Sequence, residues 1–260
     1  MKLFLCCFCL FLSINNPLYA QPVYGNDFAL PNNSWFYGVA NAYDGGVLIG
    51  GSFDNKPIWL RTTENSVQQS YNIQVPLSNN SNFNTLVYTS DSGHLAVGSR
   101  YYAKLDTGGT VEWSATNTSY YYRDVLETLN NEYILVGGKF GSPVNSPGVI
   151  KRLDTQGNLL WERNFSQNVR TAFNFVHELP NGDMIVIGRS YLTSVGYIQR
   201  RDAQGLSIWS KQINQTIEKA APMHNGDYLL LLTSNELMRI NSNGDSLSMQ
   251  QFGSGNFTNI

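Results

Sequence analysis

Short apolar segments alternate with polar turns at a regular interval along this chain. Five of the segments are almost continuously apolar, and they begin at Val47, His94, Tyr133, Met184 and Tyr228. A turn-forming sequence precedes each one: Asp44-Gly45-Gly46, Asp91-Ser92-Gly93, Asn130-Asn131-Glu132, Asn181-Gly182-Asp183 and Asn225-Gly226-Asp227. Asn, Asp and Gly tolerate the positive φ that tight primed turns require, so each turn predicts a β-hairpin. The continuous apolar character predicts that the second strand of each hairpin is buried on both faces.

Four of these buried strands end in glycine, at Gly50, Gly98, Gly137 and Gly188. A glycine at the end of an apolar strand indicates a bulge or the close approach of a neighbouring backbone, where a side chain would collide. The fifth strand carries Leu232 at this position, so we expect a different contact there.

A second pattern follows each hairpin and repeats at an interval of 48 residues. Residues 151–161 read KRLDTQGNLLW, residues 103–113 read AKLDTGGTVEW, and residues 199–209 read QRRDAQGLSIW. Asp, Gly and Trp recur in register in these copies as Asp106, Gly109 and Trp113, as Asp154, Gly157 and Trp161, and as Asp202, Gly205 and Trp209. An Asx side chain accepts hydrogen bonds from backbone two residues later, and Gly supplies a left-handed residue, so the pattern predicts a second hairpin. A weaker copy spans residues 238–248, and the first unit lacks both the Gly and the Trp.

Four strands in each unit of about 48 residues predict an all-β fold, a β-propeller of about five four-stranded blades. Residues 34–260 then form one domain. The predicted blades cover residues 34–78, 79–119, 120–168, 169–215 and 216–252. Residues 253–260 either begin a sixth unit or close the ring. A closed ring predicts a monomer, whereas an open one would expose strand edges at both ends.

The repeated VLxGG and KLDxxGxxxW motifs resemble the repeats of secreted bacterial β-propellers, including those exported with type IX sorting domains. They are more distantly similar to the tryptophan-docking repeats of quinoprotein (PQQ-like) propellers. The resemblance covers roughly residues 34–252. It implies a propeller fold and a structural role for the tryptophans, and it implies little about function because one fold serves many functions.

Residues 1–20 have the features of a secretory signal peptide: an early Lys2, an uncharged apolar run, and small Ala20 at the expected cleavage site. A membrane anchor is the alternative, but the run is too short to span a bilayer. We therefore expect a secreted or periplasmic protein in which residues 21–33 lead into the domain. Cys6, Cys7 and Cys9 are the only cysteines, so the mature chain has no thiol chemistry.

Charge gives little information about partners. Without Lys2 the chain has 16 basic and 19 acidic residues, with no run of either sign. We therefore expect no nucleic-acid binding, and no membrane span in the mature chain.

Three sets of residues are candidates for a function. The in-register tryptophans could stack against sugars, but equivalent positions in every blade favour structural pegs. The basic residues Lys104, Arg152, Arg200 and Arg239 could bind anions, but they are better explained as a solvated ladder beside the turn aspartates. The most unusual feature is a set of clustered tyrosines, which could form a binding surface or belong in part to the core: Tyr101, Tyr102, Tyr120, Tyr121 and Tyr122.

No motif assigns a catalytic, cofactor or metal site. The histidines, His94, His177 and His224, occupy non-equivalent places and share no metal-binding spacing. We therefore expect a non-catalytic scaffold that binds a protein or glycan partner through loops or an end face. The alternatives are a hydrolase or quinoprotein-like enzyme with its site in the central funnel, and a passive structural module of a larger cell-surface protein.

Overall fold

The computed structural model describes residues 34–41, 46–53, 56–62, 67–72, 82–141, 146–166 and 170–252. The predicted signal peptide, the lead-in at 21–33 and the segment 253–260 lie outside these ranges. The described residues form strands and turns without helices, so the all-β prediction is confirmed. Within them there is no helix long and apolar enough to cross a membrane.

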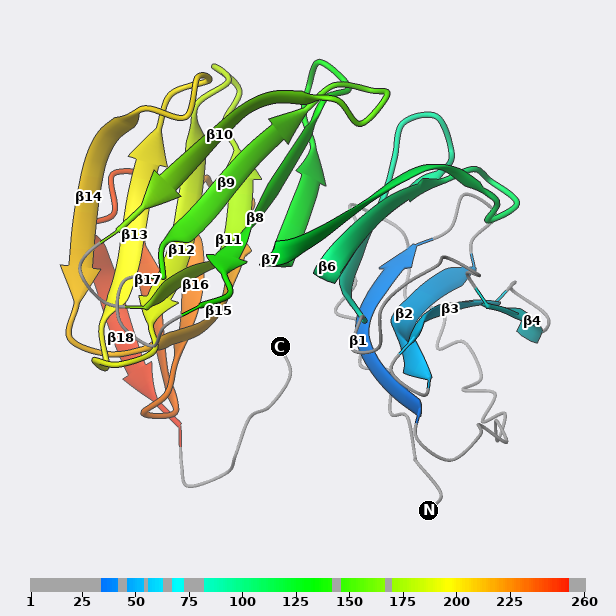
Figure 1. Ribbon diagram of the computed structural model, residues 1–260. Coiled ribbons are helices and arrows are strands. Elements are labelled where there is room, and N and C mark those ends of the chain that lie inside the picture. The colour runs from blue at the N-terminus through cyan, green and yellow to red at the C-terminus, as the bar shows by residue number, and fades with distance from the viewer. Residues whose placement is uncertain are drawn as a thin grey trace.

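The described strands form four antiparallel sheets, in which neighbours in sequence are neighbours in space (Figure 1). The first sheet contains β1 (Ser34–Asn41), β2 (Val47–Phe53), β3 (Lys56–Thr62) and β4 (Val67–Asn72). A six-stranded sheet contains β5 (Phe83–Tyr88), β6 (His94–Leu105), β7 (Val111–Glu127), β8 (Tyr133–Lys139), β9 (Gly148–Leu153) and β10 (Leu159–Phe165). The third contains β11 (Thr171–Glu178), β12 (Met184–Ser190), β13 (Gly196–Arg201) and β14 (Ser207–Ile213). The last contains β15 (Ile217–Pro222), β16 (Tyr228–Leu232), β17 (Glu236–Ile240) and β18 (Ser246–Gln251).

The prediction of five separate four-stranded blades is wrong in count, because the second and third sequence units share one sheet. The cause is β7, which runs without a loop across the expected boundary between residues 119 and 120. Its first half pairs with β6, and its second half pairs with β8. The structure therefore has four sheets, one of which holds two sequence units.

Strand β6 folds back on itself. A straight strand of its twelve residues would be about 36 Å long at roughly 3.3 Å per residue. However, a Cβ atom on Gly93 would collide with the carbonyl oxygen of Leu105, and Lys104 Nζ lies 2.7 Å from Asp91 Oδ2. Arg100 has a φ of 65° and marks the tip of this hairpin. The second and third strands predicted for this unit are thus both present within β6.

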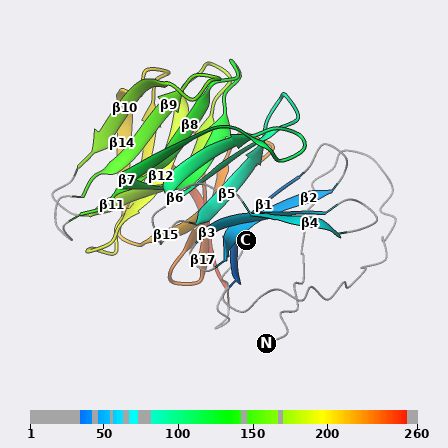
Figure 2. The same cartoon turned by 45° about the vertical axis from the view of Figure 1, so that its right-hand side comes forward.

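The buried strands are those predicted from continuous apolar runs. The first six residues of β8 and the first five of β12 are buried on both faces. Each sequence unit packs against the next largely through its first strand: β1 contacts β5, β5 contacts β7, β7 and β8 contact β11, and β11 and β12 contact β15. Figure 2 shows the same sheets from another side, with β8 to β14 on the left and β2 and β4 on the right. In the described ranges, no strand of β15–β18 packs extensively against β1–β4. Ring closure by residues 256–260 remains a prediction on residues outside those ranges.

Candidate functional site

The glycines that end the buried strands face a bulge in the first strand of the same unit. A Cβ atom on Gly98, Gly137 or Gly188 would collide with a backbone carbonyl oxygen of that strand. The pairing register shifts at this point in every unit, leaving the extra residues Tyr37, Asn84, Arg123, Asn174 and Glu218. The predicted backbone approach is therefore confirmed for these three glycines. In the first unit the glycine at the bulge is Gly51, whereas Gly50 faces the side chain of Leu86. Buried Leu232 pairs with Ile217 in the last unit.

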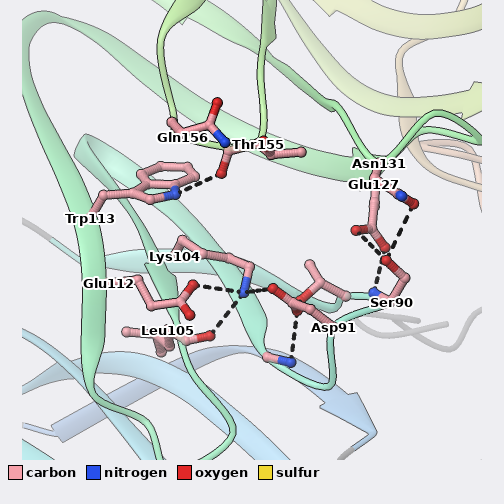
Figure 3. Close-up of polar contacts among 12 residues, drawn as sticks. Ser90, Asp91, Lys104, Leu105, Glu112, Trp113, Glu127, Asn131, Thr155 and Gln156 are labelled. Carbon is pink, nitrogen blue, oxygen red and sulfur yellow. Dashed lines mark hydrogen bonds and ion pairs between the residues drawn. The ribbon is translucent and has the colours of Figure 1, made fainter.

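The tryptophans dock on the glycine turns of the following unit. The ring of Trp113 packs against Gly157 so closely that a Cβ atom there would lie 2.7 Å from the ring. Trp161 packs against Gly205 in the same way. Trp209 covers Gly244. The Nε1–H of Trp113 also donates to the carbonyl oxygen of Thr155 at 3.0 Å (Figure 3). The tryptophans are pegs between units, as the sequence favoured.

The first unit supplies its peg from a different strand. Trp59 lies on β3 rather than β4, is fully buried, and fills the place where a side chain on Gly109 would lie. Sequence comparison between the units missed it, because Trp113, Trp161 and Trp209 all occupy the fourth-strand position. The available signal was that the first unit lacks this peg and yet contains Trp35 and Trp59, neither of which had an assigned role.

The turn aspartates have the predicted role. Asp154 accepts hydrogen bonds from the backbone N–H groups of Gln156 at 2.9 Å and Asn158 at 2.8 Å. Gly157 follows with a φ of 81°. Asp202 makes the same pair of bonds, while Asp106 accepts from Thr110. These carboxylates organise turns and are not arranged as a site.

Only part of the basic ladder is solvated, and none of its members forms an ion pair with those aspartates in the described residues, so the prediction of a solvated ladder beside them is wrong. Lys104 and Arg152 are buried, and Lys104 Nζ lies between Asp91 at 2.7 Å and Glu112 at 3.1 Å (Figure 3). Each member pairs with an acid in the first turn of its own unit, because the third strand ends beside that turn. The pairs are Lys104 with Asp91, Arg152 with Glu132, Arg200 with Asp183, and Arg239 with Asp227.

Side chains on the first strands tie consecutive units together at both ends. At one end, Glu127 accepts from the backbone N–H of Ser90 at 2.6 Å and from its hydroxyl at 3.0 Å (Figure 3). Glu178 accepts from Leu129 N–H at 2.7 Å in the same way.

Asn84 and Asn174, at the bulge position, instead donate across to the next unit. The Asn84 amide Nδ2 donates a hydrogen bond to the carbonyl oxygen of Tyr122 at 2.6 Å. The Asn174 amide Nδ2 donates to the carbonyl oxygen of Glu218 at 3.0 Å. In the third unit the residue after the bulge, Asp124, links to the next unit instead, by accepting a hydrogen bond from Val176 N–H at 2.9 Å.

The clustered tyrosines lie in the interior and do not form the exposed surface that was one of the two interpretations. Tyr101 and Tyr122 are fully buried, and Tyr102 and Tyr121 are 8% and 5% exposed. The rings of Tyr102 and Tyr122 meet edge to face at 5.5 Å, and Tyr120 donates to Glu162 at 2.7 Å. Alternation along the strands sends most of these rings between the units, as the core interpretation expected.

The histidines remain apart. His94 is buried, His177 contacts the hydroxyl of Tyr228 through Nδ1 at 2.9 Å, and His224 lies in a turn of the last sheet. In the described part of the chain, no three His, Cys, Asp or Glu side chains could hold a metal ion.

A different group of side chains converges where β7 and β8 meet β11 and β12. We call it the arginine–tyrosine cluster; it consists of Tyr121, Arg123, Arg170, Arg189 and Tyr191. The guanidinium groups of Arg123, Arg170 and Arg189 lie 5.8, 4.7 and 5.1 Å from the centre of the Tyr191 ring. Those of Arg123 and Arg170 also lie 5.5 and 5.9 Å from Tyr121.

Carboxylates balance only part of this positive charge. Arg189 forms an ion pair with Glu218 at 2.6 Å. In the described residues Arg123 has no ion pair or hydrogen bond, and the buried Nε of Arg170 has no hydrogen-bond partner. Three guanidinium groups thus meet one carboxylate in a chain whose net charge is −2. An arrangement of this kind attracts negatively charged groups.

The hydroxyl of Tyr121 interacts with that of Tyr191, and neither has another protein partner in the described ranges. Burial, followed by the neighbouring Tyr191, raises the pKa of Tyr121 to about 12 against the lowering effect of Arg123 and Arg170. Its hydroxyl therefore keeps its proton at neutral pH. The sequence analysis named Tyr121 but missed the arginines, since only the fold brings residues 123, 170 and 189 together.

Comparisons with known proteins agree with this architecture. Virginiamycin B lyase from Staphylococcus aureus, solved with quinupristin, aligns with a TM-score of 0.63 and 13% identity over 87% of this chain and 73% of that one. The WD40 β-propeller domain of Doa1 aligns at 0.60 and 13% over 88% and 71%. The Dos1 propeller aligns at 0.62 and 15% over 85% and 59%. The fold is a β-propeller.

Identities this low show the fold of this propeller and nothing more. No protein-family model matches the chain, and no curated protein matches it in sequence.

Proposed function

We propose that this chain is an exported, non-catalytic β-propeller scaffold that binds a protein or glycan partner through one end of its sheets. The observation that carries the proposal is the arginine–tyrosine cluster. The four ladder residues Lys104, Arg152, Arg200 and Arg239 are each matched to an acid. In the cluster, Arg123 and Arg170 are held by aromatic rings instead. Charged groups left without opposite charges are typical of surfaces that steer a partner.

The matched basic residues supply stability within each unit and need no ligand. The cluster sits where the first strands begin, and the bulge at Arg123 turns that residue out of the pairing ladder. Propellers bind at such ends because several units contribute side chains around one axis.

Binding can be tested with the mature chain, residues 21–260, screened against arrayed glycans and against exported proteins. We expect a partner whose binding is lost in an Arg123→Gln/Arg170→Gln double variant. The matched control is Lys211→Gln, because Lys211 is a half-exposed cation on outer strand β14 that pairs with Asp245. A partner retained by the double variant would show that another surface binds it.

Export can be tested separately by expressing the full chain and sequencing the N-terminus of the product outside the cytoplasm. We expect it to begin at Gln21. A product that keeps residues 1–20 and remains in the membrane would favour the anchor alternative.

A further inference from the structure

We infer that the arginine–tyrosine cluster binds carboxylates of an acidic polypeptide segment. This inference rests on the proposed function and narrows its partner from protein or glycan to an Asp- or Glu-rich peptide. Its basis is a set of three guanidinium groups around one aromatic ring, two of which have no carboxylate partner in the described residues.

The arginines are oriented but incompletely satisfied. Ring contacts hold the guanidinium groups of Arg123 and Arg170, and the buried Nε–H of Arg170 has no acceptor in the described residues. A buried donor without an acceptor costs free energy, which a ligand oxygen would recover. The flat guanidinium fork matches the two oxygens of a carboxylate.

Tyr121 adds a neutral donor beside these cations. Its side chain is 5% exposed, and its hydroxyl has no partner in the described chain besides the Tyr191 hydroxyl. Gly138 makes room for it, since a Cβ atom there would lie 2.6 Å from that hydroxyl. The raised pKa of Tyr121 keeps the proton available for donation at neutral pH.

The fold already shows the recognition chemistry that we propose. The carboxylate of Glu218 lies 2.6 Å from Arg189, so one arginine of the cluster binds a carboxylate from a neighbouring sheet. Arg123 and Arg170 have equivalent donors and no such partner in the described ranges. A second carboxylate, carried by a ligand, would complete the same arrangement.

A polypeptide fits this site better than a glycan. Sugars stack on open aromatic faces, but three guanidinium groups surround the Tyr191 ring and Tyr121 is almost fully buried. The available groups are N–H and O–H donors, which suit a slender side-chain carboxylate. A further cation lies close by, because Arg100 stacks on Phe140 at 4.9 Å and Phe140 contacts the Tyr121 ring at 5.1 Å.

The test uses fluorescein-labelled oligoglutamate, the mature chain, and fluorescence anisotropy at two salt concentrations. We expect binding that weakens as salt rises. Arg123→Gln and Arg170→Gln should each lower the affinity about tenfold or more, as expected for losing a charged hydrogen bond. Lys211→Gln removes one positive charge from β14 and should leave the affinity unchanged.

Tyr121→Phe separates a ligand contact from a structural role. Its hydroxyl has no protein partner in the described residues besides the Tyr191 hydroxyl, so this variant should keep a melting temperature close to that of the wild type. It should nevertheless bind oligoglutamate about three- to tenfold more weakly. A variant that binds as tightly as wild type would overturn the role of Tyr121.

The outcomes distinguish this inference from the proposed function. Arginine-dependent binding of polygalacturonate in place of oligoglutamate would overturn the peptide assignment and keep the end-face proposal. Arginine-dependent binding of inorganic phosphate alone would overturn both the assignment of an acidic peptide and the proposal that the scaffold binds a protein or glycan. Oligoglutamate binding unaffected by Arg123→Gln and Arg170→Gln would overturn the site itself.

Discussion

The docking of each tryptophan on the glycine turn of the next unit makes a sharp prediction for Gly157→Ala. Gly157 has a φ of 81°, and a Cβ atom there would lie 2.7 Å from the Trp113 ring. The added methyl group therefore causes two kinds of damage: a left-handed backbone for a residue with a Cβ, and a collision with a docked indole.

A second glycine isolates the backbone contribution. Gly226 has a φ of 84°, but nothing lies within 4 Å of the position that an added methyl group would take, so Gly226→Ala suffers the backbone strain alone. That strain costs about 1–2 kcal/mol. Overpacking at a well-filled contact adds about 1–3 kcal/mol. Gly157→Ala should thus lower the free energy of unfolding by about 2–5 kcal/mol, the sum of the two costs.

Urea unfolding of both variants measures the difference, and Trp113→Ala supplies the remaining corner of a double-mutant cycle. Without the indole, Gly157→Ala should cost no more than Gly226→Ala, because only the backbone strain remains. The reasoning fails if the two glycine variants agree within about 0.5 kcal/mol, the usual limit of additivity, while Trp113 is present. It also fails if Trp113→Ala leaves the cost of Gly157→Ala unchanged.

Three further predictions follow from single residues. Trp59→Ala should destabilise the fold by about 3–5 kcal/mol, the cost of truncating a fully buried tryptophan, and equilibrium unfolding should show a larger effect than for partly exposed Trp209→Ala. Burial raises the pKa of Asp124 to about 7, against the lowering effect of Val176 N–H, Val125 N–H and Lys219. The folded state then keeps a proton that the unfolded state releases, so stability should fall as the pH rises from about 4 to about 7; melting temperatures of Asp124→Asn should lack this slope. Partial burial acts to raise the pKa of Asp91, but hydrogen bonds from Lys104, Thr89 and Gly93 N–H lower it to about 2. The stability that the ionised Asp91 carboxylate contributes should be present above about pH 4 and lost as the pH falls toward 2. Acid unfolding of Asp91→Asn should not show this loss of stability.

Local rules were sufficient to predict the elements of this fold. Asp154 and Gly157 specify their turn through bonds within five residues of chain, so the sequence pattern alone identified it. The sequence also identified Gly98, Gly137 and Gly188 at the ends of three buried strands, because each lies beside a bulge in the neighbouring strand.

Predictions failed where the partner comes from elsewhere in the fold. The acid that pairs with Arg200 is Asp183, 17 residues away, rather than nearby Asp202. This follows from strand register, which sequence spacing does not show. The merging of two units through β7 depends on a missing loop between residues 119 and 120, where the sequence predicted a boundary between blades.

The residue at the bulge position makes different contacts in successive units. In the second and fourth units this residue is Asn84 or Asn174, and its side chain holds the next unit through a backbone carbonyl.

In the third unit Asp124 takes over that contact, so assembly makes no demand on Arg123 at the bulge. Any polar residue could therefore stand at position 123 without weakening the contact between units. The residue present is instead a cation, Arg123, which lies beside two other arginines around the Tyr191 ring. Converging positive charges oppose folding unless something negative meets them. The arrangement is therefore best explained by a ligand, and exchanging Arg123 for Asn should increase stability while it weakens binding. Equal or lower stability in Arg123→Asn would show that the cluster serves the fold instead.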